Sequence, residues 1–429
     1  MEIKDLYELF LQHPSITTDS RDVPEGSMFF ALKGETFNGN AYAKAALDQG
    51  AAYAVVDEKE YADESNGQLI LVEDVLTTLQ QLAKYHRIHL GTPIIGITGT
   101  NGKTTTKELI ATVLKKKYNV LYTQGNFNNH IGVPKTLLQL KKEHDIAVIE
   151  MGANHPGEIK TLVNIVLPDF GIITNVGKGH LLGFGSFEGV IRTKGELYDF
   201  IREIQGTVFI NNDNPYLQGI SQGLKLVKYG QKEAKGLLVR GQFMECNPFL
   251  KFEWKGGLVQ TRLIGSYNLD NALAAACIGT FFEVPATDIC AALEEYTPSN
   301  NRSQLTVTKD NRLVVDAYNA NPTSMKAALD NFRLIKAEHK MCILGQMGEL
   351  GDVSNEEHQK VVNLVGECGF EQVWLVGENF AQTDHPVSYR LFANVEDVKT
   401  ALAEKKPQGF LILIKGSNSN KLVQTVELL

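Results

Sequence analysis

An apolar run, a glycine-bounded turn and a Gly-Lys-Thr triplet follow one another over residues 94–106, and this order constrains the fold more than any other feature. Residues 94–98 are Ile-Ile-Gly-Ile-Thr, which is typical of a buried strand. Residues 99–104 are Gly-Thr-Asn-Gly-Lys-Thr and lead into a segment of helical composition. A strand, a glycine loop and a helix in this order can cradle phosphate, because backbone N–H groups and the helix N-terminus face the anion.

The loop is shorter than the common P-loop, whose spacing would require glycine at Ile97. Lys103 would supply a positive charge and the Thr104 hydroxyl a ligand for Mg²⁺. A structural glycine turn is the alternative, but the strand before and the helix after favour nucleotide binding. The predicted phosphate-loop residues are Gly99, Thr100, Asn101, Gly102, Lys103, Thr104 and Thr105.

Length and composition narrow the class of protein. A chain of 429 residues is too long for one ordinary domain, and its net charge of -8 argues against a nucleic-acid partner. The five cysteines are odd in number and form no C-x-x-C pair, so neither a disulfide framework nor a zinc site is predicted. The first eleven residues lack an apolar core, and no run approaches the roughly 20 apolar residues of a membrane span. We therefore predict a cytoplasmic enzyme without stable membrane insertion.

Strand and helix patterns divide the chain into three predicted α/β domains, residues 1–91, 92–298 and 299–429. The first alternates short apolar strands with a helical segment. The second contains the phosphate loop in a predicted parallel sheet, and the third, after residues 298–301, is predicted to be Rossmann-like. Strands are predicted at 27–32, 52–56, 94–98, 146–150, 170–175, 313–316, 341–344, 373–376 and 410–414, and helices at 41–49, 324–336 and 356–367.

Three polar residues follow predicted strands or lie near them in the second domain. Glu150 ends an apolar run, where a carboxylate could hold Mg²⁺ beside a phosphate loop; a solvated acid is the alternative. His180, in Gly-Lys-Gly-His, could complete a metal site or contact substrate, although a lone loop histidine is more often without such a role. Lys194 has the pattern of an exposed helix lysine, and nothing in its local sequence excludes that.

Two segments are rich in asparagine, residues 124–134 and 316–322. Asparagine is common in turns for purely local reasons. Its amide can also bind sugars, peptides and carboxylates without matching charge. Two such loops in a predicted nucleotide-binding enzyme indicate a polar, extended second substrate.

Together these segments resemble the Mur ligase family along the whole chain. The resemblance includes Thr-Asp-Ser-Arg at 18–21, Gly-Thr-Asn-Gly-Lys-Thr-Thr-Thr at 99–106, Glu-Met-Gly-Ala-Asn-His-Pro-Gly-Glu-Ile at 150–159 and Asp-Ala-Tyr-Asn-Ala-Asn-Pro at 316–322. The short phosphate loop is this family's form. The resemblance implies an ATP-dependent, amide-forming enzyme of peptidoglycan synthesis that adds D-alanyl-D-alanine to UDP-N-acetylmuramoyl-tripeptide through an acyl phosphate, acting with Mg²⁺ and as a monomer.

The resemblance also implies roles for individual residues. Thr104 and Glu150 would ligate one Mg²⁺ and His180 would assist with a second, while Lys194 matches a position that carries a carbamate in several relatives. Arg302 would reach the γ-phosphate. The implied catalytic residues are Lys103, Glu150, His180, Lys194 and Arg302. Further nucleotide contacts are implied for Asn268 and Asn271 on the adenine side and Asp316 at the ribose.

Substrate contacts are implied in two groups. The UDP-muramoyl peptide would contact Ser20, Arg21, Asn126, Asn128 and Asn129, and the dipeptide would lie near Asn319 and Asn321. Two departures from the family pattern are visible: Tyr267 stands where histidine is usual, and Gln346 where aspartate is common. We expect activity to survive the second change, because it does not alter the phosphate loop.

Two other functions remain compatible with the residues. A related amide ligase, adding the third amino acid or extending folate with glutamate, would use the same ATP chemistry. A nucleotide-dependent switch would use the same loop without forming a bond. The asparagine-rich segments weigh against the first, and ADP release that depends on substrate would exclude the second.

Overall fold

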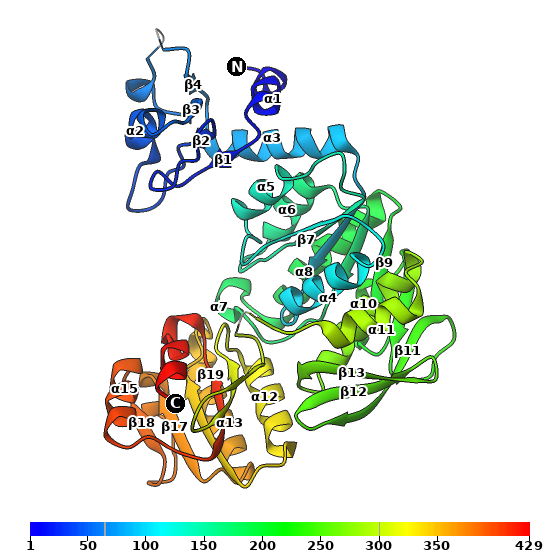
Figure 1. Ribbon diagram of the computed structural model, residues 1–429, viewed down its shortest axis with the longest axis vertical. Helices are drawn as coiled ribbons and strands as arrows, with labels where there is room; N and C mark the ends of the chain where they lie inside the picture. Colours follow the sequence, from blue (N-terminus) through cyan, green and yellow to red (C-terminus); the bar gives the residue numbers. More distant parts are fainter. Residues whose placement is uncertain (64–65, 300) are drawn as a thin grey trace. The chain divides into compact units, whose positions relative to one another are not determined.

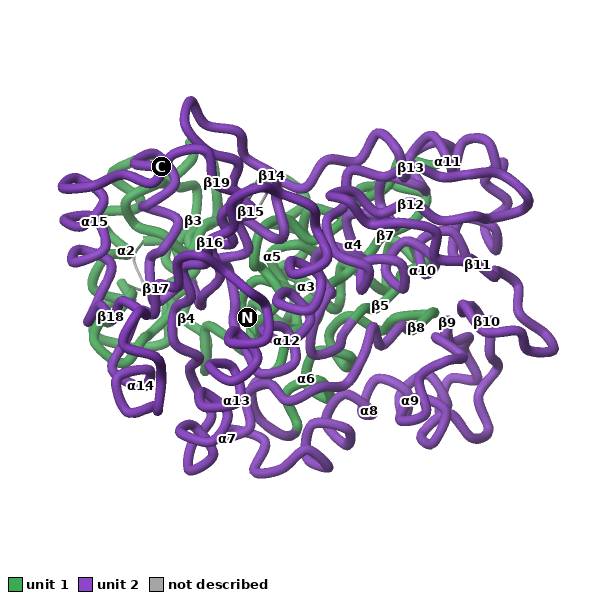
Figure 2. The backbone as a smooth tube through the Cα atoms, turned by 90° about the horizontal axis from the view of Figure 1, so that it is seen from below, with its two compact units in different colours: residues 1–97, 118–153, 157–171 green, residues 98–117, 154–156, 172–429 purple. Residues whose placement is uncertain are grey.

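The computed structural model describes residues 1–63, 66–299 and 301–429 (Figure 1). Asn300, in the predicted link between the second and third domains, lies outside the described residues. The chain divides into two compact units, residues 1–97, 118–153 and 157–171, and residues 98–117, 154–156 and 172–429 (Figure 2). Three sheets with flanking helices confirm the predicted α/β class. The three domain boundaries stay a prediction.

The first unit begins with a four-stranded sheet of order β1-β2-β3-β4, in which all pairs are parallel. Its strands carry small and aromatic residues that pack on α2, with Phe29, Ala46 and Val56 almost fully buried. The elements are α1 (Ile3–Gln12), β1 (Ile16–Thr17), β2 (Met28–Phe30), α2 (Ala43–Asp48), β3 (Tyr53–Val56), β4 (Leu69–Leu71) and α3 (Val75–Leu90).

The same unit holds the parallel strands β5, β7 and β6, in the order β5-β7-β6. All five residues of β5 and of β7 are buried, as expected for strands covered on both faces. The boundary between the units falls inside β5 and β8. The elements are β5 (Ile94–Thr98), β6 (Val120–Tyr122), α5 (Gly132–Leu137), β7 (Ile146–Glu150), α6 (Glu158–Val166) and β8 (Phe170–Ile173).

Helix α3 carries a buried histidine that ties α1 to this unit. The Tyr7 hydroxyl lies 3.1 Å from His86 Nδ1, and His86 Nε2 lies 2.9 Å from the Leu140 carbonyl oxygen. A carbonyl can only accept, so Nε2 carries the proton and Nδ1 accepts from tyrosine. Burial lowers the pKa of His86, because the charged imidazolium would lose hydration.

We expect the first unit to lose stability as the pH falls below about 6.5. There the unfolded chain protonates His86 while the folded chain keeps it neutral, which disfavours folding by up to about 1.4 kcal/mol per pH unit. Thermal unfolding of the wild type and His86→Gln at pH 7.5 and 5.5 measures this effect. The wild-type midpoint should fall further than that of the variant; equal falls would contradict the role of His86.

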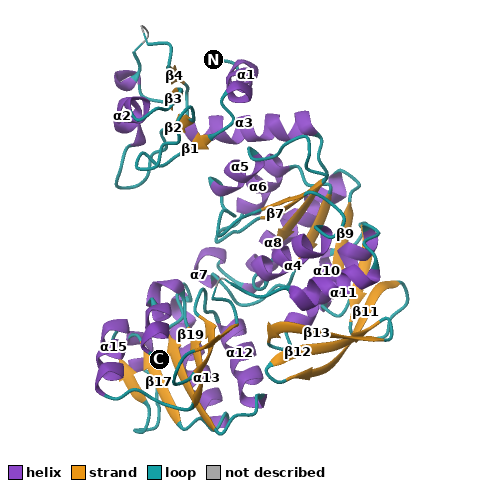
Figure 3. Cartoon of the chain, viewed as in Figure 1, coloured by secondary structure: helices purple, strands orange, loops and turns teal. Residues whose placement is uncertain are grey.

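The second unit combines parallel strands with an antiparallel extension. Strands β9, β10 and β11 are parallel, whereas β11, β12 and β13 form antiparallel hairpins that Figure 3 shows beside α11. The sequence analysis did not predict this extension. The elements are α4 (Lys103–Leu114), α7 (Leu181–Phe184), α8 (Phe187–Glu203), β9 (Thr207–Asn211), α9 (Pro215–Ile220), β10 (Lys225–Gly230), β11 (Leu237–Cys246), β12 (Phe249–Trp254), β13 (Gly257–Ile264), α10 (Asn268–Phe281) and α11 (Ala286–Glu295).

The second unit also contains a six-stranded sheet of order β14-β15-β19-β16-β17-β18, parallel except for β14. Alternate strand residues enter two cores: Cys342 and Leu344 pack with α12 and α13, and Met341 and Ile343 with α15. This is the predicted doubly covered sheet. The elements are β14 (Gln304–Val307), β15 (Arg312–Asp316), α12 (Pro322–Leu334), β16 (His339–Gly345), α13 (Ser354–Glu367), β17 (Gln372–Val376), α14 (Glu378–Ala381), β18 (Arg390–Phe392), α15 (Val395–Glu404) and β19 (Phe410–Lys415).

Candidate nucleotide and substrate site

The phosphate loop joins β5 to α4 and depends on two glycines. Gly99 has φ +144°, and a Cβ there would lie 2.0 Å from Thr174 Oγ1. Gly102 has φ +76° and immediately precedes the 12-residue helix α4. Neither position accepts a larger residue without strain, which explains the Gly-x-x-Gly spacing. The loop therefore presents its backbone and a helix N-terminus in the manner of an anion site.

Lys103, the first residue of α4, folds back over this loop. Its Nζ atom donates to the carbonyl oxygens of Gly99 and Thr100, at 2.9 and 3.0 Å. Thr104, the next residue, is buried. The ammonium group is thus held at the loop, where a phosphate would meet it.

The segment after β8 braces the phosphate loop from the other side. The Thr174 hydroxyl donates to the Asn101 carbonyl oxygen at 2.7 Å, and Asn175 Oδ1 accepts from Asn101 N at 3.0 Å. Strand β8 ends at Ile173, two residues earlier than predicted, and these two polar residues instead support the loop. The Thr-Asn pair directly after a strand was the signal that sequence reasoning passed over.

The buried side-chain atoms that have no hydrogen-bond partner among the described residues include two donors of the predicted nucleotide site, Asn101 Nδ2 and Arg302 Nε. Both residues were predicted to contact the nucleotide. A buried donor without a hydrogen bond is unfavourable unless a ligand or a water molecule accepts that bond. The two atoms therefore fit an anion with several acceptor oxygens, such as a triphosphate.

Asn268 and Asn271 lie buried on α10, directly behind the loop. Asn271 Oδ1 accepts from Thr106 Oγ1 at 3.0 Å, and its Nδ2 donates to Asn268 Oδ1 at 2.8 Å. A Cβ on Gly102 would lie 2.8 Å from Asn271 Oδ1. Both side chains therefore support α4 and its loop, and their adenine contacts stay a prediction. Tyr267, which stands where the family usually has histidine, shares a 2.6 Å hydrogen bond between its hydroxyl and Ser303 Oγ.

His180 and Lys194 lie near Lys103 in the second unit. His180 Nδ1 contacts a Glu349 carboxylate oxygen. Burial lowers the pKa of His180, Glu349 opposes this effect, and the charges of Lys103 and Lys194 add to the lowering. Lys194 is only 2% exposed, with Nζ 5.0 Å from the centroid of the Phe184 ring, so the exposed-lysine alternative is wrong.

Two predicted residues, Arg302 and Asn321, lie beside strands of the third sheet, and Asn321 contacts the same loop. The Arg302 guanidinium lies 3.9 Å from the centroid of the Tyr318 ring. Asn321 Nδ2 donates to Asn101 Oδ1 at 2.8 Å, while its Oδ1 caps α12 by accepting from Ser324 N. Asn321 thus links the 316–322 segment to the phosphate loop, and its predicted dipeptide contact is not tested by this geometry.

In the first unit, Asn128 lies against Glu150. Asn128 Nδ2 donates to Glu150 Oε1 at 2.8 Å, and Glu150 N donates to Thr123 Oγ1 at 2.9 Å. Glu150 is 1% exposed, so it is not the solvated acid of the alternative interpretation. One predicted metal ligand and one predicted substrate residue therefore share a site within this unit.

The remaining predicted substrate residues of this unit are more exposed. The Arg21 side chain is 87% exposed and forms two hydrogen bonds with the Asp19 carboxylate, which lower the pKa of Asp19. Asn126 is exposed and Ser20 is half-buried. Asn129 Oδ1 accepts hydrogen bonds from Ile131 N and Gly132 N at the start of α5.

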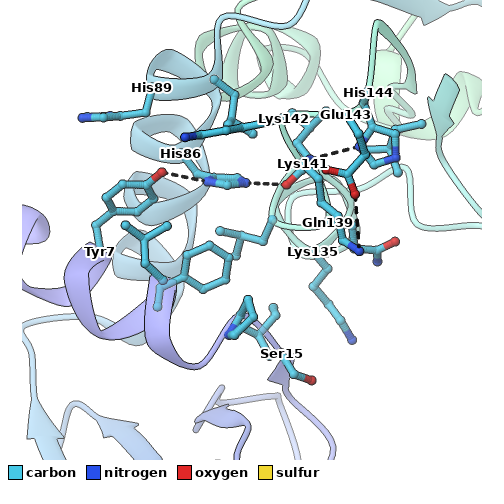
Figure 4. A pocket seen from close by; sticks show the side chains of 18 of the residues that line it. Tyr7, Ser15, His86, His89, Lys135, Gln139, Lys141, Lys142, Glu143 and His144 are labelled. Carbon is cyan, nitrogen blue, oxygen red and sulfur yellow. Dashed lines mark hydrogen bonds and ion pairs between the residues drawn. The ribbon is translucent and has the colours of Figure 1, made fainter. Parts of the chain in front are cut away.

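Lys135 on α5 is a residue that sequence reasoning missed in this region. Its Nζ atom donates to Thr18 Oγ1 at 3.4 Å and lies 5.3 Å from the centroid of the Phe127 ring. Lys135 also lines a cavity of about 1140 Å³ between α1, the end of α3 and residues 138–144 (Figure 4). None of the predicted site residues lines that cavity.

Gln346, which stands where the family commonly has aspartate, directly follows β16. Its Oε1 atom accepts from Asn379 N at 3.1 Å, and a Cβ on Gly377 would lie 2.4 Å from it. The side chain is therefore engaged with its own sheet edge.

Within residues 1–63, 66–299 and 301–429, no group of three or more His, Cys, Asp or Glu side chains forms a ready metal site. Glu150 in the first unit and Thr104 in the second each carry an oxygen donor of the kind that Mg²⁺ prefers, and their role as metal ligands stays a prediction. The same described residues include no helix with the length and apolar character to cross a membrane.

A strand–glycine loop–helix cradle, a lysine held over it and two buried donors define a nucleotide-binding α/β protein. Three family descriptions match: Mur ligase family, catalytic domain, at residues 14–87; Mur ligase middle domain at 97–279; and Mur ligase, glutamate ligase domain, at 301–418. The chain belongs to the Mur ligase family.

Among its relatives are UDP-N-acetylmuramoyl-tripeptide–D-alanyl-D-alanine ligases. That of Bacillus subtilis is 34% identical, covering 98% of this chain and 94% of the relative, and that of Escherichia coli is 33% identical, covering 97% and 93%. The crystal structure of MurF from Acinetobacter baumannii has a TM-score of 0.85 at 29% identity, covering 96% and 93% of the two chains. MurF from Thermotoga maritima in complex with ADP has a TM-score of 0.83 at 26% identity, covering 96% of each chain.

Proposed function

We propose that this protein is an ATP-dependent ligase that joins D-alanyl-D-alanine to UDP-N-acetylmuramoyl-tripeptide and releases ADP and phosphate. The observation that carries the proposal is the likeness to relatives with this ligase name, at 34% identity over 98% of the chain. The product would be the UDP-muramoyl-pentapeptide of peptidoglycan synthesis. A cytoplasmic location and a monomeric state remain predictions.

The chemistry follows from the poor reactivity of a carboxylate toward amines. The terminal carboxylate of the tripeptide would attack the γ-phosphorus of ATP, forming an acyl phosphate and releasing ADP. Lys103 and the loop amides would hold the β- and γ-phosphates, and Arg302 would offset the charge that develops during transfer. Mg²⁺, when bound, would reduce repulsion between the anions.

The second step forms the amide bond. The free amine of D-alanyl-D-alanine would attack the acyl carbonyl, and the tetrahedral intermediate would expel phosphate, with the amine proton lost to solvent or a nearby base. An acyl phosphate hydrolyses in water, so the residues of the third sheet that contact the phosphate loop would also exclude water. Asn321, bonded to Asn101, is one such residue.

The test is phosphate release with ATP, Mg²⁺, the UDP-tripeptide and D-alanyl-D-alanine, omitting each in turn, with mass detection of the pentapeptide. We expect product only when all four are present. Formation of another amide product, with a different amino acid or dipeptide but not with D-alanyl-D-alanine, would instead indicate a related amide ligase. ATP hydrolysis independent of both substrates would indicate a nucleotide switch.

We propose that Thr104 and Glu150 ligate Mg²⁺, with His180 assisting. Glu150→Gln keeps the acceptor that Asn128 uses but removes the charge, so the Mg²⁺ concentration for half-maximal activity should rise about tenfold or more. A Mg²⁺ titration of ligation measures the shift. Glu143→Gln, at an exposed carboxylate in the same unit, should leave the midpoint unchanged; an equal shift in both variants would remove Glu150 from the metal site.

A further inference from the structure

The strand β19 ends on a lysine to which the sequence analysis gave no role. The Lys415 side chain is 1% exposed, and in the parallel register of β15 and β19 it is the partner of Asp316. A buried ammonium group is unfavourable unless acceptors surround it. Lys415 Nζ has two, Asp316 Oδ2 at 2.7 Å and the Asn319 carbonyl oxygen at 3.1 Å.

Both acceptors belong to the segment with the predicted ribose and dipeptide contacts. Lys415 occupies only one oxygen of Asp316. The other, Oδ1, has no hydrogen bond in the described part of the chain, which leaves it available to a ligand hydroxyl. The same ammonium group anchors the backbone at Asn319, three residues further on. One side chain thus sets the position of both predicted contacts.

The segment 316–321 is linked to the rest of the site at two more points. Asn418, three residues after Lys415, donates from its backbone N to the Tyr318 carbonyl oxygen at 3.0 Å. The ring of Tyr318 in turn lies against the Arg302 guanidinium. Asn321 contacts Asn101 of the phosphate loop. A shift of this segment would therefore reach the predicted γ-phosphate contact and the loop together.

We propose that Lys415 is a positioning residue of the ligase reaction, holding segment 316–321 so that ATP and the dipeptide bind in the geometry the reaction needs. The proposal rests on the proposed function. A charge-assisted hydrogen bond at 2.7 Å in a buried setting is strong and directional, which suits it to this role. Lys415 touches neither substrate in this scheme and acts through Asp316 and Asn319.

Lys415→Met tests the proposal, because methionine keeps an unbranched apolar chain and removes the charge. We expect KM for ATP and for D-alanyl-D-alanine to rise about tenfold or more, and ADP affinity measured by calorimetry to fall by a similar factor. KM for the UDP-tripeptide should stay within about twofold, because its predicted contacts lie in the other unit. Asp316→Asn should give the same pattern for ATP and ADP.

Lys406→Met is a matched control. Lys406 pairs with Asp310 at 2.8 Å, at the opposite end of the same two strands. The Lys406→Met variant should keep the wild-type KM for ATP, KM for D-alanyl-D-alanine and ADP affinity. If Lys415 served only stability, its variant would unfold at lower temperature with unchanged KM values and ADP affinity in the folded fraction, and the proposal would be overturned.

The ADP titration separates this proposal from the proposed function, because it needs no ligation. A wild type that binds ADP but makes no pentapeptide would refute the ligase assignment, whereas unchanged ADP affinity in both Lys415→Met and Asp316→Asn would refute the role of Lys415. In the double variant we expect an ADP affinity close to that of Lys415→Met alone, since the two side chains act together. Fully additive losses would contradict that coupling.

Discussion

Lys103→Ala should lower kcat/KM for ligation by at least about two orders of magnitude, which corresponds to roughly 3 kcal/mol of transition-state stabilisation. The ammonium group now lies on the Gly99 and Thr100 carbonyl oxygens, at the position where the phosphates would meet it. Without it, the carboxylate would approach the γ-phosphate against uncompensated charge. Steady-state kinetics with varied ATP, together with pentapeptide detection, measures the loss.

Lys116→Ala is the matched control for this prediction. Lys116 follows the other end of α4 and pairs with Glu295 at the surface, at 2.6 Å. Its replacement should leave ligation within about twofold of the wild type. Near-normal turnover in Lys103→Ala would exclude Lys103 from the phosphate site, whatever the control shows.

Arg302→Ala should slow acyl-phosphate formation about a hundredfold or more, because a guanidinium placed on a transferring phosphoryl group stabilises charge that develops only in the transition state. Arg302 is held on the Tyr318 ring, and its Nε atom has no acceptor among the described residues. Affinity for the UDP-tripeptide should be almost unchanged. Single-turnover ADP formation measures the rate of acyl-phosphate formation, and calorimetry measures the affinity for the UDP-tripeptide.

Arg312→Ala is the corresponding control, since Arg312 is an exposed residue at the start of β15 in the same sheet. The Arg312→Ala variant should change neither the rate of ADP formation nor the affinity for the UDP-tripeptide. If Arg302→Ala weakened UDP-tripeptide binding as much as it slowed ADP formation, Arg302 would have a structural role instead.

Strands that are buried on both faces were the most predictable part of the fold. The runs at 94–98 and 146–150 coincide with β5 and β7, because a fully covered parallel strand needs continuous apolar residues. The antiparallel extension of β11, β12 and β13 was missed. Buried and exposed residues alternate along β12 and most of β13, so the local pattern of half-buried strands was present at 249–264 and was passed over. The second half of β11 lacks that alternation, and its place in the sheet depends on packing such as its contacts with α10.

The phosphate loop could be identified from sequence because its requirements are local. Gly99 and Gly102 are needed for backbone angles and close contacts, and Lys103 follows at a set spacing. Lys194 could not be judged in this way. It has the local pattern of an exposed helical lysine, yet the surrounding chain buries it to 2% exposure.

The sequence by itself determined the α/β class, the phosphate loop and the family, because these depend on short apolar runs, backbone requirements of glycine and motifs of a few adjacent residues. Only the tertiary structure decided which distant side chains act together: Asn101 with Asn321, Asn128 with Glu150, and Asp316 with Lys415. Such pairs arise from strand order and helix packing, and no spacing along the chain encodes a contact between residues 316 and 415.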